Sequence, residues 1–370
     1  MVVLQDEIDT GRSTVKADAF SMSIGELVNL YKNRELVIRP EYQRLFRWSQ
    51  EKKSRLIESI LLGIPLPSIF VMQRHDGIWE VIDGLQRIST ILEFMGELIN
   101  EATGEHFPAS TLTATKYLRS LQGMAFESDR EPTLTPGQRL AIKRSKIDVK
   151  ILLPESDDKA KYELFDRLNS GGESASPQEV RNVQLIMADR TFFQWLSELK
   201  DDEGFRDCAL VSSRQGDEQY DLELVCRFIA LSQSSAAELK SMPEVDTYLT
   251  EKMLKAATDI SFDRDATAAQ FRKTFSMLSE ALGSEAFRRY DTTKGRFTGG
   301  LSVSAFEAVT TGLQHNLAAW TTIEDRNDKL RKRVISLWDL PAFRTRARGG
   351  VRGTTRIPAI VPAAKAHFKP

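Results

Sequence analysis

Two periods of hydrophobic positions alternate along the first 190 residues of this chain. Short apolar runs that end at proline, glycine or a polar turn predict strands, because a buried strand needs few residues and a sharp stop. One pair of these runs is joined by Arg74-His75-Asp76-Gly77, which predicts a hairpin. The predicted strands cover residues 36–40, 68–73, 78–82 and 146–153.

Apolar residues at helical spacing predict helices between and after these strands. One helix buries Leu56, Ile57, Ile60 and Leu61 and ends near Gly63, and another covers residues 158–168. Residues 100–140 carry scattered Thr, Ser, Gly and Pro and predict a long excursion without regular structure. The predicted N-caps are Ser23, Ser49 and Ser176, the last followed by Pro177 and Glu179.

After about residue 190 the helical period dominates, from Phe192 to Leu337, and no strand is predicted. A length of 370 residues allows two domains with separate cores. The predicted fold class is therefore α+β, with a mixed α/β N-terminal domain over residues 1–190. An all-helical C-terminal domain is expected over residues 191–370.

The junction at Asp83-Gly84 carries the first candidate chemistry. A strand ends there, and a helix is predicted to begin with Gln86 and Arg87. Free N–H groups and the positive end of the helix dipole suit an anion at such a point. Asp83 is a candidate ligand for Mg²⁺ or a candidate to orient water, and Arg87 is a candidate to neutralise a phosphate. Alternatively, Asp83 is an N-cap or turn residue, and Gln86 and Arg87 are solvated in the first turn.

A second cluster lies in residues 39–48, where three arginines alternate with three aromatic side chains. Such a segment can hold phosphate by charge and a base by stacking. Alternatively, the aromatic residues pack in the core and the arginines extend into water. The candidate phosphate-binding residues here are Tyr42, Gln43, Arg44 and Arg47.

The third cluster is Asn169-Ser170-Gly171-Gly172, followed by Arg181. Consecutive glycines allow backbone N–H groups to converge on an anion, which makes this loop a second candidate phosphate site. A helix end that passes directly into the next N-cap explains the same residues without any ligand.

Composition excludes several other classes of function. The two cysteines, Cys208 and Cys226, form no C-x-x-C pair, and the four histidines are scattered, so neither a disulfide framework nor a zinc site is expected. No P-loop, G-x-G-x-x-G, G-x-S-x-G or H-E-x-x-H motif is present. The N-terminal residues show no secretory signal and no run spans a membrane, so a cytoplasmic protein with no membrane partner is expected.

A net charge of −1 conceals an uneven distribution. Residues 326–370 contain twelve Lys or Arg and two Asp or Glu, whereas the first 325 residues contain 39 basic and 50 acidic side chains. A basic end on an acidic body indicates a surface that binds DNA or a partner, or simply a solvated face. The glycines at 349, 350 and 353 predict that this stretch is flexible. The candidate DNA- or partner-binding residues are Arg344, Arg346, Arg348, Arg352 and Arg356.

The three clusters, in this order, resemble the N-terminal domain of GmrSD-type restriction enzymes, also called domain of unknown function 262. That family shows P-x-Y-Q-R…W, D-G-Q-Q-R and F-x-R-[LI]-N-x-G-G…E-x-R-[NH] elements. The matching segments here are residues 40–48, 83–87 and 165–182. The resemblance implies a ParB/sulfiredoxin-like fold, a role in bacterial anti-phage defence and hydrolysis of a nucleoside triphosphate. It makes Asp83, Gln86 and Arg87 the candidate catalytic residues.

Two departures from the family pattern matter. Leu85 replaces the first glutamine of D-G-Q-Q-R, which puts turnover in question if that glutamine positions water. The histidine–metal nuclease domain of full-length relatives has no counterpart around His315 or His367, so a separate nuclease or toxin subunit is the expected partner. The leading hypothesis is an NTP hydrolase. The alternatives are a nucleotide sensor without turnover and a DNA-binding scaffold of ParB type.

Overall fold

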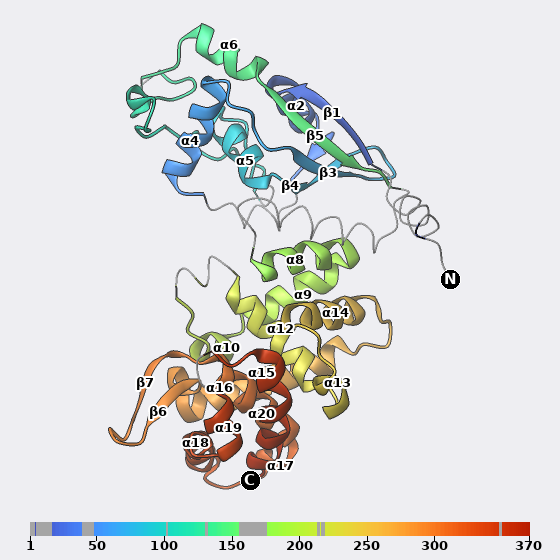
Figure 1. Ribbon diagram of the computed structural model, residues 1–370, viewed down its shortest axis with the longest axis vertical. Coiled ribbons are helices and arrows are strands. Elements are labelled where there is room, and N and C mark those ends of the chain that lie inside the picture. Colours follow the sequence, from blue (N-terminus) through green and yellow to red (C-terminus); the bar gives the residue numbers. More distant parts are fainter. Residues whose placement is uncertain are drawn as a thin grey trace. The chain divides into compact units, whose positions relative to one another are not determined.

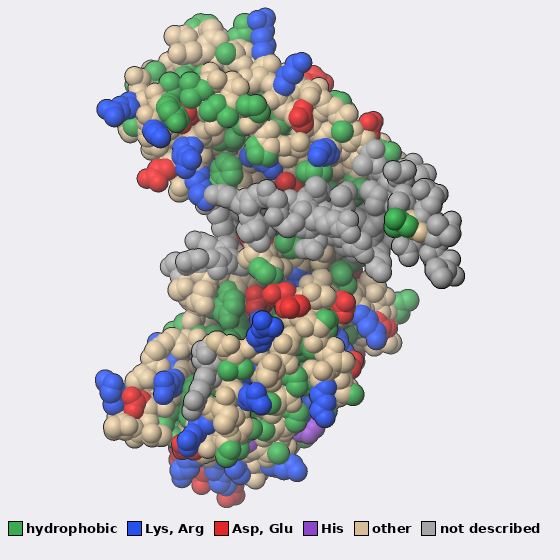
Figure 2. Space-filling view, in the orientation of Figure 1, with side chains coloured by type: hydrophobic (Ala, Val, Ile, Leu, Met, Phe, Trp, Pro, Cys, Tyr) green, Lys and Arg blue, Asp and Glu red, His purple; other side chains and the backbone are tan. Residues whose placement is uncertain are grey.

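The computed structural model describes residues 4, 17–38, 48–100, 103–129, 132–154, 176–212, 215, 219–347 and 350–370. The chain divides into two compact units, residues 1–174 and 175–370. The first contains a sheet with helices, and the second is largely helical (Figure 1). Charged side chains lie over the visible surface of each unit (Figure 2).

The first unit is built on a five-stranded mixed sheet with the order β1-β5-β3-β4-β2. β1 runs antiparallel to β5, β3 lies parallel to β5 and antiparallel to β4, and β2 lies parallel to β4. The strands are β1 (Ala17–Ser23), β2 (Leu36–Val37), β3 (Ile69–Gln73), β4 (Trp79–Asp83) and β5 (Lys146–Leu152).

The sequence predicted four of these strands but not β1. Its sequence, ADAFSMS, lacks the β-branched residues that mark a strand. β1 instead follows from its partner, because it pairs with β5 over seven residues from Ala17–Leu152 to Ser23–Lys146.

The strands of this sheet have a buried and an exposed face. In β5, Ile147, Val149 and Ile151 are buried, while Lys146, Asp148 and Lys150 are exposed. This alternation has the period of two that a half-buried strand requires, and it places the core of the unit on one side of β5.

The helices of the first unit begin where the sequence predicted N-caps. Ser23 Oγ accepts a hydrogen bond from the Glu26 N–H at 3.1 Å, and Ser49 Oγ accepts one from the Lys52 N–H at 3.4 Å. Gly63 follows the C-cap of the second of these helices with φ of +70°, as predicted for a C′ residue. The helices are α2 (Ile24–Lys32), α4 (Gln50–Leu61), α5 (Leu85–Phe94), the 3₁₀ turn η1 (Arg119–Leu121) and α6 (Pro136–Arg144).

Helix α6 begins inside the stretch that was predicted to be a long excursion and ends beyond it, at Arg144. Thr135 and Gln138 form a capping box and Pro136 occupies the first turn. The same Thr and Pro residues are frequent in loops, which is why the sequence prediction missed the helix.

A buried carboxylate of α4 helps to hold the earlier part of that stretch. Glu58 accepts hydrogen bonds from the Thr115 hydroxyl and from the N–H groups of Tyr117 and Leu118 at 2.9 and 3.0 Å. Burial raises the pKa of Glu58, but these hydrogen bonds outweigh burial and hold the pKa below its ordinary value. The ionised Glu58 therefore fixes the segment that leads into the 3₁₀ turn η1.

The turn from β4 into α5 depends on a glycine. Gly84 has φ of +92°, a left-handed conformation that other residues adopt at a cost. A Cβ atom at this position would lie 2.5 Å from Ile69 Cγ2 and 3.0 Å from Ile69 Cβ. Ile69 is fully buried in β3, so the turn packs directly on the sheet.

The second unit is helical apart from one hairpin, and the predicted α+β fold class is confirmed. Strands β6 (Arg288–Asp291) and β7 (Arg296–Leu301) pair antiparallel, so the expectation of no strand after residue 190 is wrong in this segment. The hairpin is charged and carries few apolar residues, which removes the usual strand signal. The helices are α8 (Pro177–Ala188), α9 (Arg190–Lys200), α10 (Glu203–Cys208), α12 (Tyr220–Ser232), α13 (Ala236–Lys240), α14 (Val245–Thr258), α15 (Arg264–Leu282), η2 (Gly283–Glu285), α16 (Val303–His315), α17 (Leu317–Thr321), α18 (Arg326–Leu337), α19 (Pro341–Arg346) and α20 (Gly353–His367).

Phenylalanine rings packed mostly in tilted and edge-to-face arrangements lie in the core of this unit. Phe271 and Phe275 have ring centroids 4.5 Å apart, and Phe205, Phe228 and Phe306 pack around them. Such pairs are stabilising beyond the burial of their area. Within the described residues, no helix has the length and apolar character needed to cross a bilayer.

The C-terminal stretch is more ordered than its glycines predicted. Helix α20 begins at Gly353 and continues through Pro358 and Pro362, although each proline removes one N–H donor. It packs closely on α16, because a Cβ at Gly312 would lie 2.8 Å from the Ala364 carbonyl oxygen. Tertiary packing therefore overrides the local signals here. Gly349 lies outside the described residues.

One buried carboxylate joins three helices of the second unit. Glu307 of α16 is fully buried and accepts from Arg227 Nη1 of α12 at 2.8 Å. Arg356 of α20 donates to both oxygens of Glu307 at 2.9 Å. Glu223 adds a second carboxylate to Arg227 at 2.7 Å. The two arginines balance the two carboxylates, as burial of charge requires.

We expect Gly84→Ala to destabilise the protein by about 2 kcal/mol or more, because it combines left-handed strain with a clash against Ile69. Gly77→Ala is the matched control, since Gly77 also has positive φ but open space around it. Urea unfolding monitored by circular dichroism measures both. Equal losses of unfolding free energy in the two variants would show that the contact with Ile69 does not contribute to stability.

We expect Glu307→Gln to cost about 3–5 kcal/mol, because it leaves two buried guanidinium groups without their shared carboxylate. Glu280→Gln is the control, since its ion pair with Arg326 is partly exposed and contributes about 0–1 kcal/mol. Denaturant midpoints at pH 7 give the comparison. If Glu307→Gln lowers the free energy of unfolding no more than Glu280→Gln does, the buried Glu307 cluster has no special structural role.

Candidate functional site

The β4–α5 junction places a helix N-terminus directly after the end of a strand. Asp83 ends β4, Gly84 is the N-cap and Leu85 begins α5. Gly84 carries no side chain that could cap the helix, so α5 begins without a side-chain cap. The sequence predicted a helix N-terminus here, and it lies one residue earlier than expected.

Arg87 is fixed by the loop that leads into β3. Its Nη1 donates to the Pro67 and Ser68 carbonyl oxygens at 2.7 and 3.2 Å, and its Nη2 donates to Asp83 Oδ2 at 3.1 Å. The Arg87 side chain is 13% exposed and that of Asp83 is 28% exposed. A guanidinium has five N–H donors, so Nε–H and one Nη2–H of Arg87 are not used by these three bonds.

Gln86 connects the junction to the arginine- and aromatic-rich segment. Its Oε1 accepts a hydrogen bond from the Trp48 N–H at 3.2 Å. Trp48 is the last residue of that segment, so the structure brings the end of the second cluster to the first one. The predicted residues Tyr42, Gln43, Arg44 and Arg47 themselves lie outside the described residues, as do Asn169, Ser170, Gly171 and Gly172.

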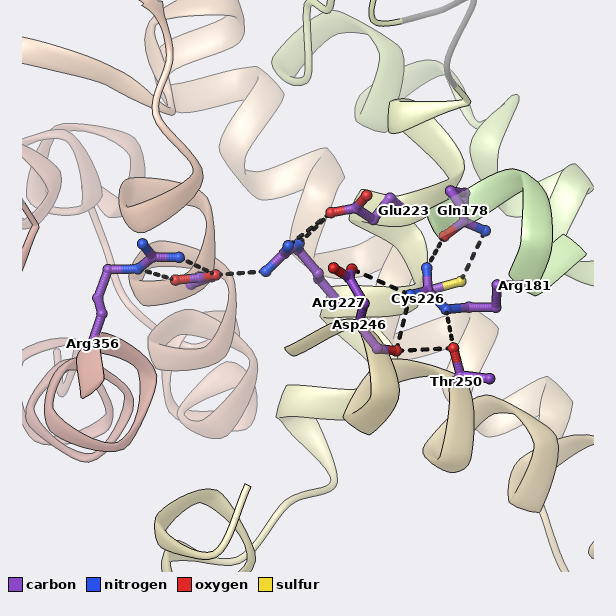
Figure 3. Close-up of polar contacts among 9 residues, drawn as sticks. Gln178, Arg181, Glu223, Cys226, Arg227, Asp246, Thr250 and Arg356 are labelled. Carbon is purple, nitrogen blue, oxygen red and sulfur yellow. Dashed lines mark hydrogen bonds and ion pairs between the residues drawn. The ribbon is translucent and has the colours of Figure 1, made fainter. Parts of the chain in front are cut away.

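Arg181, the remaining member of the third cluster, lies in a buried polar cluster of the second unit (Figure 3). The residue is fully buried. Its Nε donates to Thr250 Oγ1 at 3.1 Å, its Nη2 donates to the Asp246 carbonyl oxygen at 3.2 Å, and its Nη1 bonds to Gln178 Oε1. These bonds hold α8 on α14, and this geometry favours a structural task over contact with phosphate.

The predicted basic C-terminal residues differ in their exposure. Arg356 lies in the ion pair with Glu307, and its side chain is 11% exposed (Figure 3). Arg344, Arg346 and Arg352 are exposed, and Arg348 lies outside the described residues. The part of this prediction that needs an accessible Arg356 therefore does not agree with the structure.

The buried thiols and phenol of this unit are chemically quiet at neutral pH. Burial raises the pKa of Cys226 to about 11 and that of Tyr220 to about 12. Burial also raises the pKa of Cys208 far above its ordinary value. Protonated thiols are poor nucleophiles, so neither cysteine is a candidate for covalent chemistry.

Sequence reasoning missed the groups that position the candidate residues. The Pro67 and Ser68 carbonyls and the Trp48 N–H are backbone atoms, and no side-chain motif marks them. Glu307 had a usable signal, because it is the one charged residue in the apolar run Ala305-Phe306-Glu307-Ala308-Val309. A charge at such a position predicts a buried partner.

Comparison with known proteins agrees with the three sequence elements. Residues 24–186 match the family described as GmrSD restriction endonuclease, N-terminal domain. No curated protein and no solved structure matches the chain. The matched range begins with α2, contains the β4–α5 junction and ends within α8. The family predicted from the sequence motifs is thereby confirmed, and residues 24–186 of this chain belong to the GmrSD N-terminal domain family.

Proposed function

We propose that the first unit binds a nucleoside triphosphate at the β4–α5 junction and hydrolyses it, as a component of a restriction-type anti-phage system. The observation that carries this proposal is the N-terminus of α5, which lacks a side-chain cap, beside the Asp83–Arg87 pair, with Gln86 bonded to the end of the arginine- and aromatic-rich segment.

Phosphate is the ligand chemistry that this junction suits best. A helix N-terminus combines unpaired N–H donors with a positive partial charge, and both favour a multivalent anion. Arg87 adds a full positive charge next to these donors, and the bonds from Arg87 to Pro67 and Ser68 hold it there. A guanidinium fixed in advance loses little entropy when it binds a phosphate group.

Asp83 has two uses in this scheme. Its Oδ2 accepts from Arg87, and its Oδ1 is the proposed contact to a cation or a water. Mg²⁺ is commonly held by one or two carboxylates together with the phosphates of the substrate, so a single Asp83 fits that arrangement. When bound, Mg²⁺ would neutralise charge on the phosphates, while Asp83 orients the attacking water and Arg87 stabilises charge on the transferred group.

Gln86 is proposed to act as a positioning residue. Its hydrogen bond to the Trp48 N–H fixes the C-terminal end of the arginine- and aromatic-rich segment. That segment contains Tyr42, Gln43, Arg44 and Arg47. These residues are the proposed contacts to base and phosphate. The loop of residues 169–172 is proposed as a further phosphate contact.

A separate nuclease or toxin subunit is part of the proposal. Within the described residues, no group of three or more His, Cys, Asp and Glu is placed to hold a metal ion. His367 contacts the Arg333 carbonyl oxygen and Ser336, and it packs against Phe368. Cleavage of DNA is therefore assigned to a partner that nucleotide turnover would control.

A phosphate-release assay with Mg²⁺ tests the hydrolase. We expect Asp83→Asn and Arg87→Lys each to lower the rate about a hundredfold, the order of magnitude lost when one charge-stabilising group is removed. Both substitutions keep the approximate size of the side chain. The melting temperature of each variant separates loss of catalysis from loss of folding.

The matched control is the other Asp–Arg pair on the same sheet. Arg74 and Asp76 form an ion pair of 2.7 Å in the turn between β3 and β4, where both side chains are largely exposed. Asp76→Asn and Arg74→Lys should leave phosphate release unchanged. Equal rates in all four variants and the unaltered protein would end the hydrolase proposal.

A second function, nucleotide binding without turnover, is favoured by one observation. Leu85 is the first residue of α5 and stands where the family pattern has glutamine. If that glutamine positions water in relatives, the protein with Leu85 binds nucleotide and releases no phosphate. Binding alone raises stability by about 2.7 kcal/mol when nucleotide reaches 100 times its dissociation constant.

Leu85→Gln distinguishes these two functions. Under the sensor model, the unaltered chain shows a thermal shift with nucleotide and no phosphate release, and Leu85→Gln gains release that Asp83→Asn removes again. Under the hydrolase model, the unaltered chain already releases phosphate. Absence of any thermal shift with purine or pyrimidine triphosphates in the presence of Mg²⁺ contradicts both.

A further inference from the structure

The hairpin β6–β7 is an ordered, strongly basic element that no part of the proposed hydrolase uses. Residues 288–301 contain four basic side chains and one acidic one. Asp291 Oδ1 accepts from the Thr293 and Lys294 N–H groups at 3.0 and 3.1 Å, and Gly295 has φ of +61° at the turn. The turn is therefore defined by its own hydrogen bonds.

Pairing of the strands sets which side chains share a face. Tyr290 lies opposite Phe297, and their rings are 5.1 Å apart. Phe297 is buried under the guanidinium of Arg331, at 5.3 Å from the ring centroid. Side chains alternate along a strand, so the neighbours Arg289 and Arg296 lie on the other face, and both are exposed.

Helix α18 adds a second basic element next to the hairpin. It contains five basic residues and one acidic residue. Leu330, Val334 and Leu337 are buried, whereas Lys329 and Lys332 are exposed on the opposite side. In Figure 2, Lys and Arg side chains lie over the hairpin and over the region of α18.

Ion pairs neutralise only some of these charges. Arg326 pairs with Glu280 and Arg331 pairs with Glu285, so these two arginines serve the fold. Within the part of the chain that the structure describes, Arg296, Lys329 and Lys332 have no carboxylate within ion-pair distance. The remaining charge is therefore directed at solvent or at a ligand.

We propose that the hairpin β6–β7 and the exposed face of α18, together called the basic surface, bind the phosphate backbone of duplex DNA. This inference does not depend on nucleotide hydrolysis in the first unit. It also places DNA contact at residues other than the arginine run of residues 344–356 from which a basic surface was first expected.

The chemistry of the basic surface favours DNA over a protein or a membrane. Among the described residues, none of the exposed large hydrophobic side chains belongs to the hairpin, α18 or α19. A protein interface needs buried apolar or aromatic anchors, and an interfacial helix needs an exposed apolar face. Phosphate contacts need only accessible cations and small polar donors.

The shape of the hairpin favours a B-form duplex. The major groove of B-DNA admits a two-stranded ribbon, whereas the major groove of duplex RNA is too narrow for side chains to read. Gly299 and Gly300 in β7 have open space where a Cβ would be, so the backbone itself can approach a phosphate closely.

Fluorescence anisotropy of a labelled duplex of about 25 base pairs, titrated with the full chain without nucleotide, tests the proposal. We expect binding at low salt whose logarithm falls linearly with the logarithm of salt concentration. The triple variant Arg296→Gln, Lys329→Gln, Lys332→Gln should lose at least about tenfold in affinity at 0.1 M salt and reduce the slope by about 3.

The matched control removes the same residue types elsewhere on the second unit. Arg206, Lys240 and Lys255 are exposed on α10, α13 and α14, and Arg206→Gln, Lys240→Gln, Lys255→Gln removes the same charge. This variant should retain the affinity and the slope of the unaltered chain. Circular dichroism confirms that both triple variants are folded.

Several outcomes overturn the proposal. These are no binding of duplex at 50 mM salt, equal losses in the two triple variants, or a salt slope that is the same in all three proteins. Tighter binding of duplex RNA, of phosphatidylserine vesicles or of an acidic peptide than of DNA also rejects it. Phosphate release is measured separately, so failure here leaves the hydrolase proposal unaffected.

Discussion

The contact of Gly84 with Ile69 is the constraint on which the candidate site depends. It lets β4 turn into α5 within one residue, so that Asp83, Gln86 and Arg87 all lie at one helix N-terminus. The Pro67 and Ser68 carbonyls then fix Arg87, and Gln86 binds the Trp48 N–H. A side chain at residue 84 would push α5 from β3 and disturb each of these contacts together.

Three arginines of the second unit have structural partners inside the protein, in contrast to Arg87 at the candidate ligand site. Arg181, Arg227 and Arg356 are directed into the protein, where carboxylates, carbonyls and hydroxyls satisfy them. Breaking one partner leaves an uncompensated buried charge, so these residues are costly to change for reasons of folding. Arg181 shows that a residue of a family motif can contribute to the architecture around a site without facing the ligand.

The basic side chains of the second unit fall into two groups, those paired within the fold and those exposed on the surface. The net charge of −1 is the sum of an uneven distribution. The hairpin and α18 are strongly basic, although the first 325 residues, which include the hairpin, are acidic when taken together. Arg326 and Arg331 stabilise the fold through Glu280 and Glu285. Their neighbours on the exposed side remain available, and the proposal of DNA binding rests on that difference rather than on the number of basic residues.

Local signals in the sequence determined the strands β2 to β5, the caps at Ser23, Ser49 and Ser176, and the family, because period, cap chemistry and motif spacing are properties of neighbouring residues. Only the tertiary structure decided that ADAFSMS pairs with β5, that α20 continues through two prolines, and that Arg356 is buried. It also decided the partners of Arg87 and Gln86, which are backbone atoms of Pro67, Ser68 and Trp48. These outcomes depend on contacts between residues distant in the chain, and no local pattern encodes which of them form.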